Sequence, residues 1–310
     1  METIELNEFM PLPFGENPNQ VAVMAKIDDG IDYEILSQNK EIEYIDYLNL
    51  SEAIKICAEF FDVDCAVITN ESHICSVALG ANLHNAFEKS LDCDPVSSYN
   101  ATVAFSKEVD LELAKQIVSI KFRNIIAPNF SKNAIDYLTD KDINVVKLNS
   151  PLQELLGFTT KDIKITPFGA LIQEQNRAKL TKDNFKVATK TKPSQQQAED
   201  AIFAWKISKH LKSRSAIIAK DLATKAIIQA RPNSIVTTEI ALDYACEATK
   251  DAVLALDGVI ESPQIINSAI QARIGLIIDS NDGMNSSEIT KLADKYSISI
   301  ISTGIRNNKY

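Results

Sequence analysis

The stretch ATVAFSKEVDLELAKQIVSIKFRNIIAP, residues 101–128, decides the fold class of this chain. A short apolar run at 102–105 is followed by residues 110–118, which have the pattern of an amphipathic helix. A second apolar run at 124–127 stops at Pro128, because proline has no N–H for a strand ladder. Strand, helix and strand in succession predict an α/β fold with a largely parallel sheet covered by helices on both faces.

The same alternation continues on both sides of this stretch and extends the α/β prediction to almost the whole chain. Buried strands are expected at 65–68, 143–146, 216–219, 252–255, 275–278 and 297–302. Helices are expected at 76–89, 131–138, 239–250, 264–272 and 286–295.

A lysine-rich segment, residues 177–193, interrupts the alternation and ends at Pro193. Since 310 residues exceed one average domain, we expect two α/β units, 1–192 and 193–310, joined by this segment. Ser194 is the expected N-cap of the next helix. Trp205 lies on the apolar stripe of that helix, so we expect it in the core. The two halves are similar in organisation, but we can align no sequence repeat between them.

Composition narrows the possible functions. The chain has 45% apolar and 24% charged residues and a formal net charge of −10. An acidic surface repels nucleic-acid phosphates, and no apolar run is long enough to span a bilayer, so we expect neither nucleic-acid nor membrane binding. Five cysteines without a C-x-x-C pair predict no disulfide framework and no metal site. With no visible signal peptide, the expected location is the cytoplasm.

Six short motifs occur in a fixed order along the chain. They are PFGENPNQ (13–20), DPVS (94–97), IAP (126–128), GALIQ (169–173), FAWKISKHLKS (203–213) and TGIR (303–306). Together they resemble the aminoimidazole carboxamide ribonucleotide (AICAR) transformylase family, the formyltransferase half of the bifunctional purine-biosynthesis enzyme.

The resemblance implies two cytidine-deaminase-like units and a homodimer with sites at the subunit interface. It also implies formyl transfer from 10-formyltetrahydrofolate to AICAR in purine biosynthesis. We expect no ring closure to IMP, because the sequence has no room for the family's cyclohydrolase domain. The substrate-binding residues that the resemblance implies are Phe14, Gly15, Asn17, Asp94, Ser97 and Arg306. Asp94 and Ser97 could instead cap the following turn, and Arg306 could be a surface charge.

The family's chemical residues are largely replaced in this sequence. Its Lys–His pair aligns with Asn70 and Glu71, and its asparagine with Arg214. A glycine-rich stretch on the folate side aligns with residues 228–231, IQAR. Ile228 and Ala230 are expected to place side chains where a ligand needs bare backbone. The loss of a general acid–base costs about 10²–10⁴ in rate.

One proton carrier could remain near the altered motif. A two-residue shift of the alignment places His73 at the family's histidine position, with Glu71 or Asp94 as its orienting carboxylate. His73 is therefore the candidate catalytic residue, although it could instead be a surface or capping histidine.

Three hypotheses follow. The chain could be an AICAR formyltransferase with a rearranged site, or a non-catalytic dimeric scaffold or partner of an active paralogue. It could also be an altered enzyme that uses Glu71, His73 and Arg214 on another phosphorylated small molecule. Convergence of those three side chains on one cavity would favour the altered enzyme.

Overall fold

A computed structural model describes residues 5–27, 30–157, 161–281 and 287–310. The chain divides into two compact units. Unit 1 comprises residues 1–73, 82–84 and 96–177, and unit 2 comprises residues 74–81, 85–95 and 178–310. The domain boundary at 192/193 stays a prediction.

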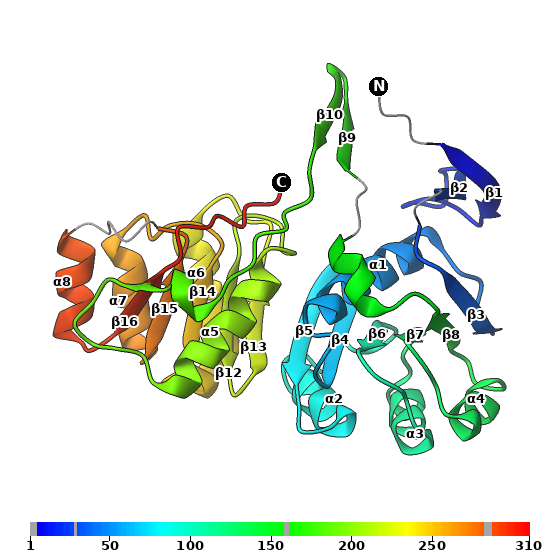
Figure 1. The fold of residues 1–310 in the computed structure, drawn as a ribbon, viewed down its shortest axis with the longest axis horizontal. Coiled ribbons are helices and arrows are strands. Elements are labelled where there is room, and N and C mark those ends of the chain that lie inside the picture. Colours follow the sequence, from blue (N-terminus) through cyan, green and yellow to red (C-terminus); the bar gives the residue numbers. More distant parts are fainter. Residues whose placement is uncertain (1–4, 28–29, 158–160, 282–286) are drawn as a thin grey trace. The chain divides into compact units, whose positions relative to one another are not determined.

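Unit 1 contains a mixed sheet with strand order β4-β6-β7-β8-β3 (Figure 1). The pairs β6–β7 and β7–β8 are parallel, whereas β4–β6 and β3–β8 are antiparallel. Its strands are β3 (Tyr33–Gln38), β4 (Cys65–Asn70), β6 (Thr102–Phe105), β7 (Asn124–Ala127) and β8 (Asn144–Leu148). Its helices are α1 (Tyr44–Glu59), α3 (Leu111–Ile120) and α4 (Lys132–Leu138), with a 3₁₀ turn at Leu152–Gly157.

In unit 2 the strands pair in the order β11-β16-β15-β14-β12-β13-β5. The pairs β14–β15 and β15–β16 are parallel, whereas β12 pairs antiparallel with both β13 and β14. Its strands are β5 (His73–Leu79), β11 (Lys186–Val187), β12 (Ala216–Lys220), β13 (Ala223–Ile228), β14 (Val253–Leu256), β15 (Leu276–Asp279) and β16 (Ser299–Ser302). Its helices are α2 (Leu83–Leu91), α5 (Gln195–Ser208), α6 (Ser234–Ala245), α7 (Pro263–Gln271) and α8 (Ser287–Lys295), with 3₁₀ turns at Lys182–Asn184 and Cys246–Thr249.

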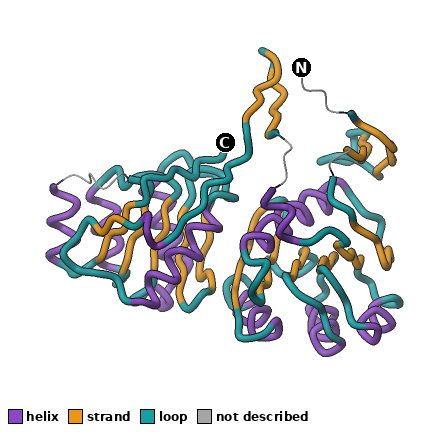
Figure 2. Tube along the Cα trace, viewed as in Figure 1, coloured by secondary structure: helices purple, strands orange, loops and turns teal. Residues whose placement is uncertain are grey.

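Helices and strands alternate along the chain, which confirms the α/β prediction (Figure 2). The sheets are less parallel than expected, because antiparallel strands flank the three parallel strands of each unit. Ser194 caps α5 in a capping box with Gln197, and Trp205 is buried, both as expected.

The expected helix at 76–89 is wrong in its first half. Residues 73–79 form β5, and α2 begins only at Leu83. Ala78 pairs with Ala223, and the Leu79 N–H donates to the Leu222 carbonyl, so the backbone here is committed to a sheet. The expected helix at 239–250 instead starts at Ser234, because the Asn233 side chain accepts from two N–H groups of its first turn.

The two halves of the chain repeat one order of elements: a helix, two strands, and then three helix–strand pairs (Figure 1). In each half the two strands of the opening pair are joined by two residues with positive φ, Glu71–Ser72 and Asp221–Leu222. The sixth residue of the preceding helix holds this turn in both cases. Asn49 Oδ1 accepts from Ser72 N at 2.8 Å. The Asp200 carboxylate accepts from Asp221 N at 3.1 Å and Leu222 N at 2.7 Å.

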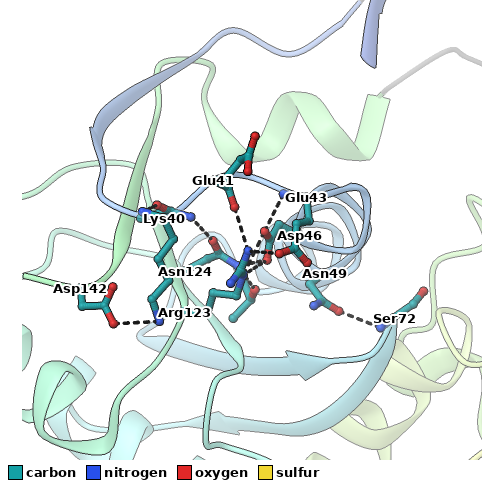
Figure 3. Close-up of polar contacts among 11 residues, drawn as sticks. Lys40, Glu41, Glu43, Asp46, Asn49, Ser72, Arg123, Asn124 and Asp142 are labelled. Atoms are coloured by element: carbon teal, nitrogen blue, oxygen red, sulfur yellow. Dashed lines mark hydrogen bonds and ion pairs between the residues drawn. The ribbon is translucent and has the colours of Figure 1, made fainter. Parts of the chain in front are cut away.

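A buried polar network fixes the start of α1 in unit 1 (Figure 3). Asp46, in the first turn of α1, is 0% exposed. Its carboxylate accepts from Arg123 Nε at 2.8 Å and from Asn124 Nδ2 at 2.7 Å. Asn124 Oδ1 in turn accepts from Asn144 Nδ2 at 3.0 Å. The network therefore joins α1 to the first residues of β7 and β8.

Two further hairpins form separate two-stranded sheets. The first consists of β1 (Leu6–Leu12) and β2 (Ala22–Ile27). The second consists of β9 (Asp162–Thr166) and β10 (Gly169–Gln173). Neither was expected from the sequence.

Candidate functional site

The altered Lys–His motif lies in the turn between β4 and β5. Asn70 is the last residue of β4, and its Nδ2 donates to the Ser97 carbonyl at 3.0 Å. Glu71 and Ser72 have φ of 50° and 60°, in the left-handed region. The structure thus brings two predicted site positions, Asn70 and Ser97, into direct contact.

His73 is exposed at the start of β5. Its Nδ1 lies 2.6 Å from the main-chain oxygen of Glu71. A ring nitrogen at that distance from a carbonyl must carry a proton, which leaves Nε2 as the nitrogen able to accept one in neutral histidine. The contact with Glu71 is made through its backbone and not through the carboxylate that the sequence suggested.

The N-terminal motif lines a cavity of about 410 Å³, whose wall also includes Tyr44 at the start of α1. Gly15 N donates to Gln20 O at 2.8 Å, and Asn17 Nδ2 donates to Gln20 Oε1 at 2.9 Å, which closes the loop. Gly15 belongs to the cavity wall, but Phe14 and Asn17 do not. The volume is within the range of small-molecule pockets.

A second hollow of about 370 Å³ lies beside Tyr99 and Asn100, directly after the DPVS motif. Three lysines line it with one carboxylate: Lys40, Lys121, Lys141 and Asp142. Lys40 is paired with Asp142 at 3.2 Å. The excess of positive charge makes this hollow suited to an anionic group, although the whole chain is acidic.

In unit 2, a polar cluster surrounds Asp257, directly after β14. The buried carboxylate accepts from Ser213 Oγ at 2.6 Å and from Ser215 N at 3.1 Å. The chain's last residues join the same cluster, because Lys309 N donates to Ser213 Oγ at 3.1 Å. Burial raises the pKa of Asp257, against the opposing effects of these hydrogen bonds and of the Arg214 charge.

Arg214, at the family's asparagine position, is held by an ion pair. Its Nη1 lies 2.6 Å from Glu261 Oε1, and Ser234 Oγ donates to the other oxygen of Glu261 at 3.1 Å. The Arg214 side chain is about one-third exposed, and a guanidinium has five N–H donors. An arginine fixed in this way is a charged donor for an oxyanion or phosphate.

Asp279, the last residue of β15, is a second buried carboxylate. It accepts from Ser302 Oγ at 2.8 Å and from Ile260 N at 3.3 Å. Burial outweighs these bonds and raises its pKa to about 6. The Thr303 N–H donates to the Asp279 carbonyl, so the TGIR motif starts beside this residue, while Arg306 is exposed.

The stretch at 228–231 lies against the motif that contains Arg214. Arg214 N donates to Arg231 O at 2.8 Å, and Ala230 N donates to Lys212 O at 2.9 Å. The Ile228 side chain packs against the hydrophobic core of unit 2. Ala230 is exposed and has a φ of 58°, the backbone conformation that favours glycine.

Replacing Ala230 with glycine should therefore stabilise the protein. Relief of the left-handed strain, about 1–2 kcal/mol, exceeds the extra unfolded-state entropy of glycine, about 0.5–1 kcal/mol. We expect a net gain of roughly 0.5–1 kcal/mol in urea denaturation. The matched control Ala272→Gly, at a φ of −81°, should lose stability instead. A loss of stability in A230G would contradict the strain.

The structure groups the predicted site residues within the units, not as one set. Asn70, Glu71, His73, Ser97 and the N-terminal motif belong to unit 1, whereas Asp94, Arg214 and Arg306 belong to unit 2. Asp94 lies beside Tyr244, where burial and the carboxylate raise the tyrosine pKa to about 12. The shared cavity for Glu71, His73 and Arg214 stays a prediction.

Sequence reasoning missed the carboxylates Asp257 and Asp279, as well as Glu261. A signal was present, because Asp257 directly follows one apolar strand of the parallel part of the sheet and Asp279 is the last residue of another. Ligands of α/β sheets bind at such carboxyl ends.

Among the described residues, no group of three His, Cys, Asp or Glu could hold a metal ion. No helix in the described ranges has the length and apolarity to cross a membrane.

Comparisons with known proteins identify the family. A family model described as the AICARFT/IMPCHase bienzyme matches residues 1–244. Proteins named bifunctional purine biosynthesis protein PurH, from Caldicellulosiruptor bescii and a Thermoanaerobacter species, are each 33% identical, over 99% and 96% of this chain. A relative of the same name from Bacillus cereus is 29% identical over 99% of it. The chain spans about 60% of the length of these relatives. The chain therefore belongs to the AICARFT/IMPCHase bienzyme family and corresponds to its transformylase part.

Proposed function

We propose that this chain acts as an AICAR formyltransferase of purine biosynthesis, a cytoplasmic homodimer that takes its formyl group from 10-formyltetrahydrofolate. The observation that carries the proposal is the family match over residues 1–244. The strand order and the repeated element order of the two halves support the cytidine-deaminase-like units that the proposal includes.

The reaction requires groups that move protons and a group that stabilises negative charge. The AICAR amine attacks the formyl carbon, a C–N bond forms, and the amine loses a proton. The tetrahedral oxyanion then collapses, the bond to the folate nitrogen breaks, and that nitrogen gains a proton. A proton carrier and an oxyanion donor are therefore required.

The proposal assigns the roles of proton carrier, oxyanion donor and folate site to residues present in this chain. His73 Nε2 takes and returns the proton, because Nδ1 is occupied by the Glu71 carbonyl. In unit 2, taken by itself, Arg214 is fixed by Glu261 and is the charged donor suited to an oxyanion. The turn at 228–231 receives the folate: its glycine-like backbone at Ala230 is retained, and Ile228 points to the core.

A second candidate function is a non-catalytic relative that serves as a dimeric scaffold or partner. It is favoured by the replacement of the Lys, His and Asn of the family motif with Asn70, Glu71 and Arg214. The Asn70 amide donates to the Ser97 carbonyl, and Arg214 forms an ion pair with Glu261. Both side chains therefore stabilise the fold without a ligand. A third candidate function is an enzyme that acts on a different phosphorylated substrate. The lysine-lined hollow at Tyr99 supports it, because lysines attract phosphate.

Calorimetric titration separates these candidates. A formyltransferase should release heat with AICAR and with a folate analogue, whereas a scaffold should bind neither. No heat with either ligand, from protein shown to be folded, would overturn the proposed function. Heat with phosphorylated compounds other than AICAR would point to the altered enzyme.

Turnover should then depend on His73. With active protein, His73→Gln should lower the rate of tetrahydrofolate release by about 10²–10⁴, the usual cost of a lost general acid–base. His84→Gln is the control, because His84 is bonded to Asp110 at 3.0 Å and has no part in the proposal. Equal rates for both variants would remove His73 from the mechanism.

A further inference from the structure

The lysine-lined hollow beside Tyr99 lies at the amino ends of the three parallel strands of unit 1. Its lining residues at 99–100, 121–122 and 141–143 stand just before β6, β7 and β8, and Lys40 joins them from the end of β3. Hydrogen-bonded ladders fix where these strands start, so they also place the residues that precede them. The hollow is therefore built by the sheet of unit 1.

Positive charge exceeds negative charge in this hollow. Three lysines and one carboxylate line it, which leaves two positive charges without a counter-charge among the lining residues. Lys40 Nζ lies 3.2 Å from Asp142 Oδ2, so this pair is neutral as a whole (Figure 3). Lys141 Nζ lies 4.7 Å from the centre of the Tyr137 ring, a contact that leaves its charge in place. Lys121 and Lys141 are therefore the charges available to a ligand.

Lys121 and Asn100 offer polar groups that the protein itself does not use. Both line the hollow, and within the described ranges neither side chain forms a hydrogen bond or an ion pair. Their backbones are joined, because Asn100 N donates to Lys121 O at 3.1 Å. The ammonium and the carboxamide are thus held at one wall with their hydrogen-bonding capacity unspent.

The backbone conformation of Lys121 is unusual for a lysine. This residue ends α3 with a φ of 66°, in the left-handed region where glycine is the common residue. A cation near a helix C-terminus is favourable by itself. That effect explains one lysine, but it does not bring three lysines from separate segments to one hollow. Backbone strain clusters at ligand sites, so the conformation of Lys121 supports a binding role.

We infer that the lysine-lined hollow binds a small phosphate monoester. At neutral pH such an ester carries a charge of about −1.5 to −2, which matches the two available lysines. A monocarboxylate would leave one of these lysines unmatched. A nucleic acid is disfavoured, because the net charge of −10 repels a long phosphate backbone, whereas a single phosphate meets mainly the local field of the hollow.

The hollow also has room for the molecule that carries the phosphate. Its volume of about 370 Å³ is within the range of small-molecule pockets. Val118, Phe122 and Ile143 supply an apolar wall. The Asn100 amide and the Tyr99 hydroxyl supply donors and acceptors for the hydroxyl groups of a sugar-sized ester.

The inference goes beyond the proposed function and does not depend on it. The hollow contains none of the groups that the proposed reaction uses, which are His73, Arg214 and the turn at 228–231. Turnover tests His73, whereas binding of a phosphate ester tests Lys121, so either proposal can fail alone. AICAR is itself a phosphate monoester, and heat from AICAR that persists in Lys121→Gln comes from another site.

Calorimetric titration of the full chain with ribose 5-phosphate tests the site. The wild-type protein should bind it, and Lys121→Gln should weaken binding at least about tenfold, the usual effect of losing a hydrogen bond to a charged group. Lys115→Gln is the matched control, because Lys115 lies on the same helix and is exposed and paired with Glu112 at 2.7 Å. Its affinity should stay within about threefold of wild type, since solvent screens a charge outside the hollow. No heat at millimolar concentration, or equal losses in the two variants, would overturn the inference.

Three other anions test the choice of ligand. Inorganic phosphate should bind more weakly than ribose 5-phosphate, because it leaves the apolar wall and the Asn100 amide without a partner. Citrate should also bind more weakly, and tighter binding of citrate would assign the hollow to polycarboxylates instead. Inorganic sulfate that binds as tightly as ribose 5-phosphate would show an adventitious ion only, and would overturn the inference.

A measurement on the unaltered chain guards against misfolded variants. Lysines are acetylated with acetic anhydride, and the modified positions are quantified by mass spectrometry. Ribose 5-phosphate should slow the acetylation of Lys121 and Lys141 and leave that of Lys115 unchanged. Equal rates with and without the ester at Lys121 and Lys141 would exclude the hollow as its binding site.

Discussion

Replacing Asp46 with alanine should cost about 3–5 kcal/mol of unfolding free energy, the usual loss when one partner of a buried ion pair is removed. Asp46 is fully buried and accepts from Arg123 Nε, Asn124 Nδ2 and the Glu43 N–H (Figure 3). Without it, the Arg123 guanidinium keeps Glu43 but loses its buried partner. The start of α1 also loses its capping box.

The measurement should report on unit 1, because a chain of two units need not unfold in one step. Hydrogen exchange of the α1 amides at low urea concentration measures the unfolding free energy of unit 1 separately. Glu112→Ala is the control: its ion pair with Lys115 is exposed and is worth no more than about 1 kcal/mol. A loss below about 1 kcal/mol in D46A would show that the network does not hold α1.

The second large effect concerns Asp279 and pH. Its folded-state pKa is about 6 against an ordinary value of 3.8, so the folded state holds this proton more tightly than the unfolded state. The protonated Asp279 carboxyl therefore stabilises the folded state fully below about pH 4, and this stabilisation is lost as the pH rises through 6. The shift of about 2.2 units corresponds to roughly 3 kcal/mol, at 1.36 kcal/mol per unit. Asp279→Asn cannot titrate, and should therefore gain roughly 3 kcal/mol relative to wild type between pH 4 and pH 8.

Ser302→Ala tests the cause of this pH effect. Ser302 Oγ donates to Asp279 and opposes the effect of burial, so its removal should raise the pKa of Asp279 further. Relative to wild type, S302A should lose more stability as the pH rises. D279N could also lose a hydrogen bond, which would lower its unfolding free energy by the same amount at every pH. This would shift its plot of unfolding free energy against pH without changing the slope. Parallel pH profiles for wild type and D279N would refute the raised pKa.

The sequence predicted most of the regular elements, because their signals are local. The apolar runs at 102–105 and 124–127 are strands, and the periodic stretch between them is a helix. The cap at Ser194 and the buried position of Trp205 also follow from neighbouring residues alone. The order of the six motifs was sufficient to indicate the family, which the match over residues 1–244 confirms.

Distant contacts decided what the sequence could not. Residues 76–79 have a periodicity that suits a helix. They form a strand instead, because they pair with the backbone of β13, about 145 positions later. The side chain of Ile228 packs against the core of unit 2, which the residues next to it in the sequence do not reveal. Asp257 and Asp279 stand at the ends of apolar runs, but the sequence does not show that their carboxylates are buried.

The sequence by itself therefore determined the fold class, the alternation of elements and the family, since these depend on patterns within about twenty residues. Only the tertiary structure decided the burial of Asp46, Asp257 and Asp279, the partner of Arg214 and the hollow that three lysines share. Burial and pairing depend on which segments meet in space, and desolvation there changes what the same side chain does.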